Sequence, residues 1–251
     1  MEFEKITSRQ NAAVKHLRAL SRDKAYRKEC GEFVCDGEKL LSEAVSSNCE
    51  ITYIITSEEA AGRIPTVSGA RCFVAPQDVI DSITSLKNAQ SVIFACRLPE
   101  IRAKEINRAI ILDSLQDTGN IGTIIRTADA FGIDAVIVDG CADVYNPKTI
   151  RSAMGSLFRV AIIEGELSDI IPRLRADGMK VFASELYGET KNITDVSFDR
   201  ACVVIGNEGN GVRREISKLC DASVIIPMQG ETESLNAAVA ASIFMYKMSE
   251  R

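Results

Sequence analysis

The feature that most constrains the fold is an apolar strand that runs directly into a glycine-rich turn near the end of the chain. Residues 202–205 are Cys-Val-Val-Ile, and Gly206, Gly209 and Gly211 follow at once. A continuous apolar run of this kind is typical of a strand buried on both faces. The glycines indicate a sharp turn or a close approach of the backbone to a ligand, and one acid, Glu208, lies among them.

A second strand and a long final helix follow this turn. Residues 224–226 are apolar, and Pro227 ends the strand because proline cannot donate to a ladder. Beyond the polar loop 229–233, we expect Ser234 to cap an alanine-rich helix. The small residues of this helix favour close packing against a neighbouring helix, and this surface can include the interface of a dimer. These residues are Ala237, Ala238, Ala240 and Ala241. Polar loops at the ends of neighbouring strands predict a ligand site here.

The composition is that of a globular protein with one large domain or two ordinary ones. The chain has 251 residues, of which 46% are hydrophobic and 26% charged. The first ten residues lack the pattern of a secretory signal, and no apolar run approaches the roughly 18 residues that span a bilayer. We therefore expect a cytoplasmic protein.

The cysteines and the single histidine argue against metal and triad chemistry. The eight cysteines contain no C-x-x-C pair, and His16 is the only histidine. We expect reduced, mostly buried cysteines and no metal site. A Ser-His-Asp or Cys-His mechanism would need a histidine near the site, and none is present beyond the amino-terminal segment.

A basic segment opens the chain, although the net charge is −5. Residues 5–28 contain eight lysines and arginines and one acid, Asp23. A local basic face can bind a phosphate backbone despite an acidic body, because the local field decides. The alternative is an ordinary solvated helix face. Residues 11–20 have the apolar spacing of a helix with its basic residues on the other side.

The remaining pattern predicts two α/β domains. In the first, we expect strands at residues 31–36, 51–56, 71–75 and 91–96 and helices at 37–47 and 77–86, in a mixed or parallel sheet. Pro99 and dense charge then mark a linker. The predicted division is a domain at residues 1–98, a linker at 99–107 and a second domain at 108–251.

The second domain restarts with an apolar strand at residues 109–113 and a helix that Gly119 and Gly122 open and Gly132 closes. Asp117 or Thr118 can cap this helix. Further strands are expected at residues 135–138, 157–163 and 179–183, and a proline-initiated helix at 145–154. With the two strands near the tail, this gives six strands in a mostly parallel sheet covered on both faces.

The glycines do not fit the familiar nucleotide motifs. The P-loop pattern is absent, and Gly206, Gly209 and Gly211 give G-x-x-G-x-G, the wrong order for a dinucleotide fingerprint. Three other stretches carry a more specific signal. DTGNIGTIIRTADAFG, VVIGNEGNGV and IIPMQGETESLNAAVAAS resemble the three ordered motifs of the SpoU/TrmH family of SPOUT RNA 2′-O-ribose methyltransferases. The only visible departure is Ala237 and Ala238 after the Ser-Leu-Asn triplet.

The resemblance extends to the amino-terminal segment, where ITSRQNAAVKHLRAL and GEFVCDGEKLL are similar to the ribosomal-protein-like substrate-binding domain of many members. It implies an α/β fold whose carboxyl-terminal parallel sheet is tied in a trefoil knot, S-adenosylmethionine as cofactor and a homodimer. Residue by residue, it implies that the cofactor is held by Gly206, Ile226, Met228, Leu235 and Asn236. It implies a reaction centre of Asn120, Arg126, Glu208, Ser234 and Asn236.

Several of these roles have plainer alternatives. Arg126 can be a surface arginine, Glu208 can fix the turn through backbone N–H groups, and Asn236 can be only a helix cap. A sulfonium methyl group is already electrophilic, so the protein must mainly position a ribose hydroxyl. Because arginine stays protonated, we expect Arg126 to grip a phosphate or the developing alkoxide, while the proton leaves through phosphate or water.

The expected substrate is structured RNA, namely 23S ribosomal RNA, with transfer RNA as the alternative. The predicted RNA contacts are Arg9, Lys15, Arg18, Arg22, Lys24, Arg27, Lys28, Lys148 and Arg151. A catalytically silent RNA-binding protein of the same fold is a second hypothesis, against which the intact polar set argues. A nucleotide-dependent enzyme acting on small molecules is disfavoured by the basic segment and by the order of the motifs.

Overall fold

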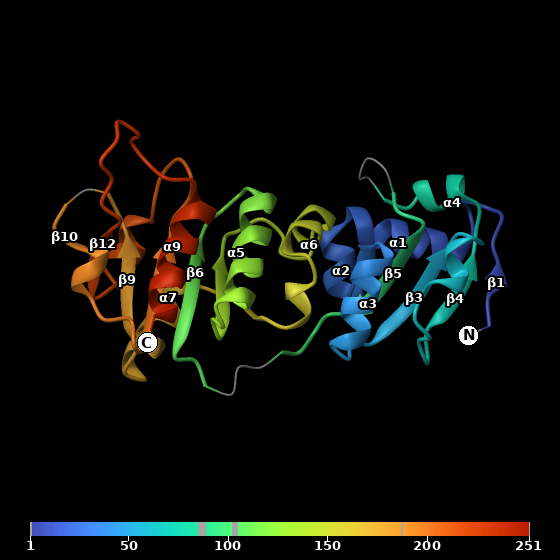
Figure 1. Cartoon of the computed structure of the whole chain (residues 1–251), viewed down its shortest axis with the longest axis horizontal. Helices are drawn as coiled ribbons and strands as arrows, with labels where there is room; N and C mark the ends of the chain where they lie inside the picture. Colours follow the sequence, from blue (N-terminus) through green and yellow to red (C-terminus); the bar gives the residue numbers. More distant parts are fainter. Residues whose placement is uncertain (1, 85–88, 102–104, 187, 251) are drawn as a thin grey trace. The chain divides into compact units, whose positions relative to one another are not determined.

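The computed structural model describes residues 2–84, 89–101, 105–186 and 188–250. The chain forms two compact units (Figure 1). The first comprises Met1–Glu100 with Asp143–Phe158, and the second Ile101–Ala142 with Arg159–Arg251. The predicted domain boundaries stay a prediction, and part of the predicted linker, residues 102–104, lies outside the described residues.

The first unit contains a mixed five-stranded sheet with the order β1-β4-β3-β5-β2. Strands β1, β4 and β3 are parallel, whereas β5 is antiparallel to both β3 and β2. All four strands predicted for this part are present, and β1 is an additional short edge strand. Their bounds are Glu4–Lys5 (β1), Glu32–Asp36 (β2), Ile51–Thr56 (β3), Arg71–Val74 (β4) and Val92–Arg97 (β5).

The helices of this unit follow their capping residues. The side chain of Asn11 accepts a hydrogen bond from the backbone of Ala13 and starts α1, as the apolar spacing predicts. Asp23 ends α1 and caps a second helix, α2, which the sequence pattern did not separate from it. The bounds are Ala12–Arg22 (α1), Lys24–Cys30 (α2), Glu38–Ser46 (α3), Gln77–Asp81 (α4) and Pro147–Ala153 (α6), with 3-10 turns at Ala60–Gly62 (η1) and Ser156–Phe158 (η2). The helix expected at 77–86 ends earlier, at Asp81, and the last predicted residues, 85 and 86, lie outside the described residues.

The second unit is built on a seven-stranded sheet in which every pair of neighbours is parallel. Its order is β10-β12-β9-β11-β6-β7-β8. The predicted α/β class with a parallel sheet is confirmed, and β10 is a seventh, short edge strand. The bounds are Arg108–Asp113 (β6), Ala135–Asp139 (β7), Ala161–Glu164 (β8), Lys180–Ser184 (β9), Thr190–Asn192 (β10), Ala201–Ile205 (β11) and Ala222–Ile225 (β12).

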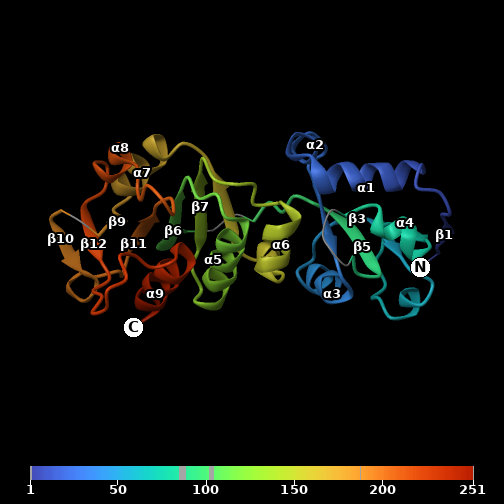
Figure 2. The same ribbon diagram turned by 90° about the horizontal axis from the view of Figure 1, so that it is seen from above.

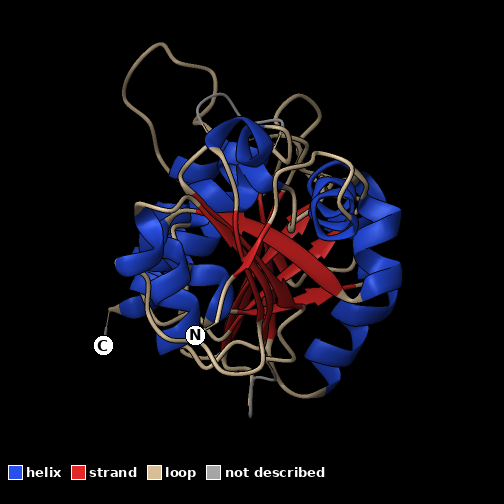
Figure 3. Ribbon diagram, turned by 90° about the vertical axis from the view of Figure 1, so that its right-hand side faces the viewer, coloured by secondary structure: helices blue, strands red, loops and turns tan. Residues whose placement is uncertain are grey.

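Helices cover both faces of this sheet, with α7 and α8 on one side and α5 and α9 on the other (Figure 2). Figure 3 colours the helices and strands of the chain by type. Helices α5 and α9 pack against each other on one face, and α9 also contacts β6 and β11. Helices α7 and α8 bury Leu167, Ile171 and Ile216 against the other face. The bounds are Thr118–Ala130 (α5), Leu167–Ala176 (α7), Arg214–Ser217 (α8) and Ala237–Ser249 (α9), with a 3-10 turn at Ile193–Asp195 (η3). Within the described ranges, no helix has the length and apolar character required to cross a bilayer.

The capping residues of α5 and α9 fix the positions of polar side chains in this unit. Asp117 caps α5, and Gly132 follows the helix at φ +62°, as the glycine pattern predicts. The prediction that Ser234 caps α9 is wrong. Asn236 is the cap, and its Oδ1 accepts from the backbone N–H groups of Ala238 and Val239. The helix starts two residues later than expected because this amide satisfies two free donors.

Candidate functional site

A cavity of about 630 Å³ lies at the carboxyl ends of three neighbouring strands, β9, β11 and β12. Three segments of the second unit form its wall: residues 184–186, residues 205–212 and parts of residues 226–240. This is the edge of a parallel sheet where ligands commonly bind, and the volume is within the usual range for small-molecule sites.

The glycine loop of this wall is folded back on itself. Asn207 and Gly211 exchange two backbone hydrogen bonds of 2.9 and 3.0 Å, and Gly211 has φ +69°. The Oδ1 atom of Asn207 also accepts from the N–H groups of Gly209 and Asn210 at 3.0 and 3.2 Å. A Cβ atom on Gly206 would lie 2.0 Å from the backbone carbon of Gly211. Only glycine fits at position 206 without displacing the loop.

Charged residues anchor this loop to the neighbouring strands. Arg213 donates from its backbone N and its Nε to the carboxylate of Asp113 at 2.8 and 2.6 Å, and from Nη2 to Asp139. The Asp113 side chain is fully buried. The Nδ2 group of Asn207 donates to the carbonyl of Ser114 at 2.9 Å. Arg213, Asp113 and Asp139 are not among the predicted site residues, although an acid that ends a buried strand is a usable signal.

A chain of hydrogen bonds joins the three sequence motifs beside the cavity. The Nδ2 group of Asn236 donates to Oδ1 of Asn120 at 3.0 Å, and Nδ2 of Asn120 donates to Oε1 of Glu208 at 3.1 Å. Because Oδ1 of Asn236 is occupied by the helix cap, its Nδ2 faces Asn120. The donor of Asn120 is thereby directed at Glu208.

Most of the predicted site residues meet here. The cavity is lined by Gly206, Glu208, Ile226, Met228, Ser234, Leu235 and Asn236, and Asn120 bonds two of them. Arg126 lines neither this cavity nor the hollow beside it. It is exposed on α5, six residues beyond Asn120, which places it about 9 Å farther along the helix and about 120° around it.

A second hollow of about 450 Å³ lies between the outer faces of α5 and α9. Its lining is mostly apolar and includes Phe131, Val239 and Tyr246, with Thr123 and Asn120 at one side. Val239 and Tyr246 are 48% and 56% exposed, which is high for such side chains. The alanines of α9 differ in their surroundings. Ala237 and the half-buried Ala240 line the cavity of about 630 Å³, and Ala238 lines this hollow, whereas Ala241 is fully buried in the unit.

The predicted RNA contacts of the first unit differ in availability. Arg27 is 4% exposed, is ion-paired with Asp143 and donates to the carbonyl of Leu20. Arg151 is ion-paired with Asp36, and Arg9 with Asp78 at 2.9 Å. Arg18 donates to the backbone and hydroxyl oxygens of Ser82, both at 2.8 Å. The exposed members are Arg9, Lys15, Arg22, Lys24, Lys28 and Lys148, and Arg18 is half-buried.

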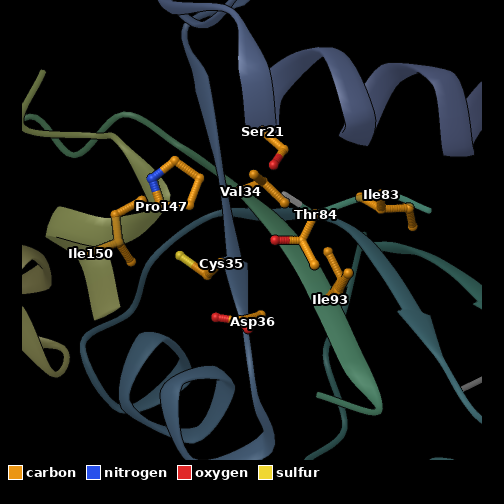
Figure 4. A pocket seen from close by; sticks show the side chains of 9 residues that line it. All are labelled: Ser21, Val34, Cys35, Asp36, Ile83, Thr84, Ile93, Pro147 and Ile150. Carbon is orange, nitrogen blue, oxygen red and sulfur yellow. The ribbon is translucent and has the colours of Figure 1, made fainter. Parts of the chain in front are cut away.

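The first unit also contains a small hollow among core residues (Figure 4), where Ser21, Val34 and Ile93 meet Pro147 and Ile150. Its volume of about 10 Å³ is no more than one water molecule requires, so we regard it as a packing gap. In the part of the chain that the structure describes, no group of three or more His, Cys, Asp or Glu side chains is arranged to hold a metal ion.

Comparisons with known proteins agree with this arrangement. Residues 107–246 match the model of the SpoU rRNA Methylase family, and residues 11–94 match the MRM3-like substrate binding domain. The chain is 34% identical to 23S rRNA (guanosine(2553)-2′-O)-methyltransferase RlmP of Bacillus subtilis, over 98% of this chain and 99% of that protein. It is 32% identical to a 23S rRNA (uridine(2479)-2′-O)-methyltransferase of Streptomyces viridochromogenes, over 97% and 91%.

Solved structures give the same result for the fold. The AdoMet-bound rRNA methyltransferase from Sinorhizobium meliloti superposes with a TM-score of 0.86 at 30% identity, over 98% of this chain and 97% of that one. AviRb from Streptomyces viridochromogenes, in complex with AdoMet, gives a TM-score of 0.79 at 28% identity, over 96% and 97%. The family model covers more than half of the chain, and a relative above 30% identity covers nearly all of it. The chain therefore belongs to the SpoU rRNA methylase family, as its three motifs predict.

Proposed function

We propose that this protein transfers a methyl group from S-adenosylmethionine to a ribose 2′-hydroxyl of 23S ribosomal RNA. Family membership and the AdoMet-bound relatives support the predicted enzyme class and cofactor. The observation that carries the proposal is that Glu208 and Asn236, two ends of one hydrogen-bond chain, both line the cavity. The polar side chains that we assign to the substrate hydroxyl thus lie in the wall of the proposed cofactor cavity.

The cavity fits the cofactor in size and in character. Gly206 leaves its backbone open to the cavity, and we assign Gly206, Ile226, Met228, Leu235 and Asn236 to cofactor binding. Backbone groups and small side chains can hold an adenosine without charged ligands. When bound, the cofactor supplies an electrophilic methyl group, so the chain needs to provide position rather than a metal.

Glu208 is the residue we assign to the substrate hydroxyl. Asn120 occupies Oε1 of its carboxylate, and no described residue donates to Oε2. A fixed carboxylate with one unoccupied oxygen can accept the hydrogen bond of a ribose hydroxyl and orient its oxygen. Ser234 is exposed at the cavity wall and is assigned to the same polar set. Asn120 and Asn236 act as positioning residues in this scheme.

Arg126 completes the site in a homodimer. It is exposed on α5, at helical spacing from Thr123, which lines the apolar hollow between α5 and α9. We propose that a second copy of the chain covers this hollow, because Val239 and Tyr246 are unusually exposed there. Arg126 would then act in the partner's site, on the phosphate beside the target ribose or on the developing alkoxide.

The proposed RNA-binding part is the predicted domain 1–98 together with residues 143–158, which belong to the same compact unit. Lys15, Arg18 and Arg22 form a stripe along α1, and Ser82 holds the Arg18 guanidinium in place. Other contacts are proposed for Arg9, Lys24, Lys28 and Lys148. We leave out Arg27 and Arg151, whose ion pairs with Asp143 and Asp36 hold this unit together.

Two further properties belong to this proposal. A trefoil knot is supported by the chain path after β12, because residues 226–236 return across the sheet to α9, which packs on β6 and β11. A cytoplasmic location is supported by the proposed substrate. The knot is also what the family resemblance implies.

The test compares methylation of three kinds of RNA by the purified protein. Purified protein is incubated with methyl-labelled S-adenosylmethionine and equal amounts of unmodified 23S rRNA, 16S rRNA or transfer RNA. We expect label in 23S rRNA alone, and loss of it with Glu208→Gln. Label that accumulates in transfer RNA would contradict the proposed substrate, and label in no RNA would contradict the proposed activity.

A further inference from the structure

The cavity wall is acidic. The wall contains three carboxylates, Glu185, Glu208 and Glu233, and none of its described residues is a lysine or an arginine. Glu208 is bonded by Asn120, and Glu233 is exposed to solvent. Glu185 is the half-buried carboxylate of the three. It directly follows β9, the strand that lies between β12 and β11. A charge there interacts more strongly with a ligand than an exposed charge does, since water screens it less.

Glu185 is fixed in place by β12. Its backbone N–H donates to the carbonyl of Val224 at 3.2 Å, and the hydroxyl of Ser223 donates to its Oε2. Burial and then the negative charge of Glu185 raise the pKa of the neighbouring Cys220 thiol to about 12. Within the described ranges Glu185 has no ion-pair partner. A partly desolvated carboxylate without a cation is unfavourable in isolation, and a cationic ligand in the cavity would compensate it.

We propose that Glu185 recognises the positive sulfonium of the methyl donor, so that the site prefers S-adenosylmethionine to the product S-adenosylhomocysteine. This inference rests on the proposed function. Methyl transfer breaks the sulfur–methyl bond and forms a methyl–oxygen bond on ribose, and the hydroxyl proton passes to water. The bonding electrons stay on sulfur, which becomes a neutral thioether. Glu185 then loses its counter-charge, and this favours release of the product.

The experiment is calorimetric titration of S-adenosylmethionine and S-adenosylhomocysteine into wild-type protein and Glu185→Gln. The isosteric amide keeps a side-chain acceptor but removes the charge. For a half-buried pair we expect the affinity for S-adenosylmethionine to fall about tenfold and that for S-adenosylhomocysteine less than about twofold. Glu233→Gln removes the same charge from the exposed part of the wall, and should change the ratio of affinities less than about twofold.

A second variant keeps the inference testable if Glu185→Gln is unstable. Ser223→Ala leaves the charge but frees the carboxylate, and should lower the preference for S-adenosylmethionine by an intermediate factor. An equal loss of affinity for both ligands in Glu185→Gln, or no loss for either, would overturn the role of Glu185. Wild-type protein that binds neither ligand would instead contradict the proposed function.

Discussion

The side-chain amide of Asn120 donates a hydrogen bond of 3.1 Å to Glu208, across 88 residues of sequence. A second bond, from Asn236, reaches Asn120 across 116 residues. The helix cap on Oδ1 of Asn236 sets the orientation of both amides, so the donor that faces Glu208 is determined by the backbone of α9. The three motifs are thus coupled through hydrogen bonds beside the cavity.

This coupling predicts the effect of Asn120→Asp. The substitution keeps the shape of the side chain and the oxygen that accepts from Asn236, but it replaces the donor to Glu208 with a second negative group. We expect kcat for methyl transfer to fall by about 10² to 10³ and the Kd for S-adenosylmethionine to change less than threefold, because the loss is in positioning. Single-turnover assays and calorimetry measure the two quantities.

Asn192→Asp is a matched control for this change. Asn192 caps a 3-10 turn of the same unit through its Oδ1, an acceptor that aspartate retains. Activity within twofold of wild type is expected. A fall in cofactor affinity as large as the fall in kcat for Asn120→Asp would show that the positioning role is wrong.

Gly206→Ala is predicted to damage the cavity. The new Cβ would lie 2.0 Å from the carbon of Gly211 and 2.1 Å from the nitrogen of Val212, and both are backbone atoms. The loop must move, at a stability cost of about 1–3 kcal/mol. We expect cofactor affinity to fall more than tenfold by calorimetry. Gly209→Ala is the control, because its Cβ would meet only Oδ1 of Asn207, at 3.6 Å. Similar affinities for the two variants would refute this prediction.

Arg213→Met is predicted to destabilise the second unit. The substitution leaves the fully buried carboxylate of Asp113 without its cation, which commonly costs about 3–5 kcal/mol. Urea denaturation should show the midpoint shift, and cofactor binding should weaken because the 206–212 loop loses its anchor. Arg214→Met, at an exposed neighbouring position, should change the free energy of unfolding by less than about 0.5 kcal/mol. Equal midpoints for the two variants would be inconsistent with a structural role for the Arg213 ion pairs.

The proposed dimer predicts complementation between two inactive variants. If Arg126 acts in the partner's site, co-expressed Arg126→Ala and Asn120→Asp chains form mixed dimers with one intact site. Random pairing gives roughly a quarter of wild-type activity, because half of the dimers are mixed and each has one working site of two. Light scattering should give the mass of two chains. Activity that stays at the level of the separate variants would place Arg126 in its own subunit's site.

Local patterns predicted most of the fold. Apolar runs located six strands of the parallel sheet, although the strand expected at 157–163 begins only at Ala161, after a 3-10 turn. Glycine and capping signals located both ends of α5. The cap of α9 was misplaced because Ser234 and Asn236 are both good caps, and the choice depends on a bond to Asn120 from another motif. The short strands β1 and β10 have too few residues to show a period.

Long-range pairing limited the prediction of the site. The family motifs identified the cavity residues, but they did not indicate that Arg213 would return to Asp113, 100 residues earlier. The charge pattern marked Arg27 as a surface residue, whereas the fold buries it against Asp143, 116 residues later. Such partners depend on which loops lie at the same edge of a sheet. A single sequence does not show which distant residues the fold brings together.

The chemical position of the transferred methyl group is the most direct test of the central claim. Protein is incubated with methyl-labelled S-adenosylmethionine and 23S rRNA, and the RNA is then hydrolysed in alkali. A methylated ribose oxygen cannot attack the neighbouring phosphate, so the account predicts label in alkali-resistant dinucleotides. Label found only in mononucleotides would indicate methylation of a base and would contradict the account.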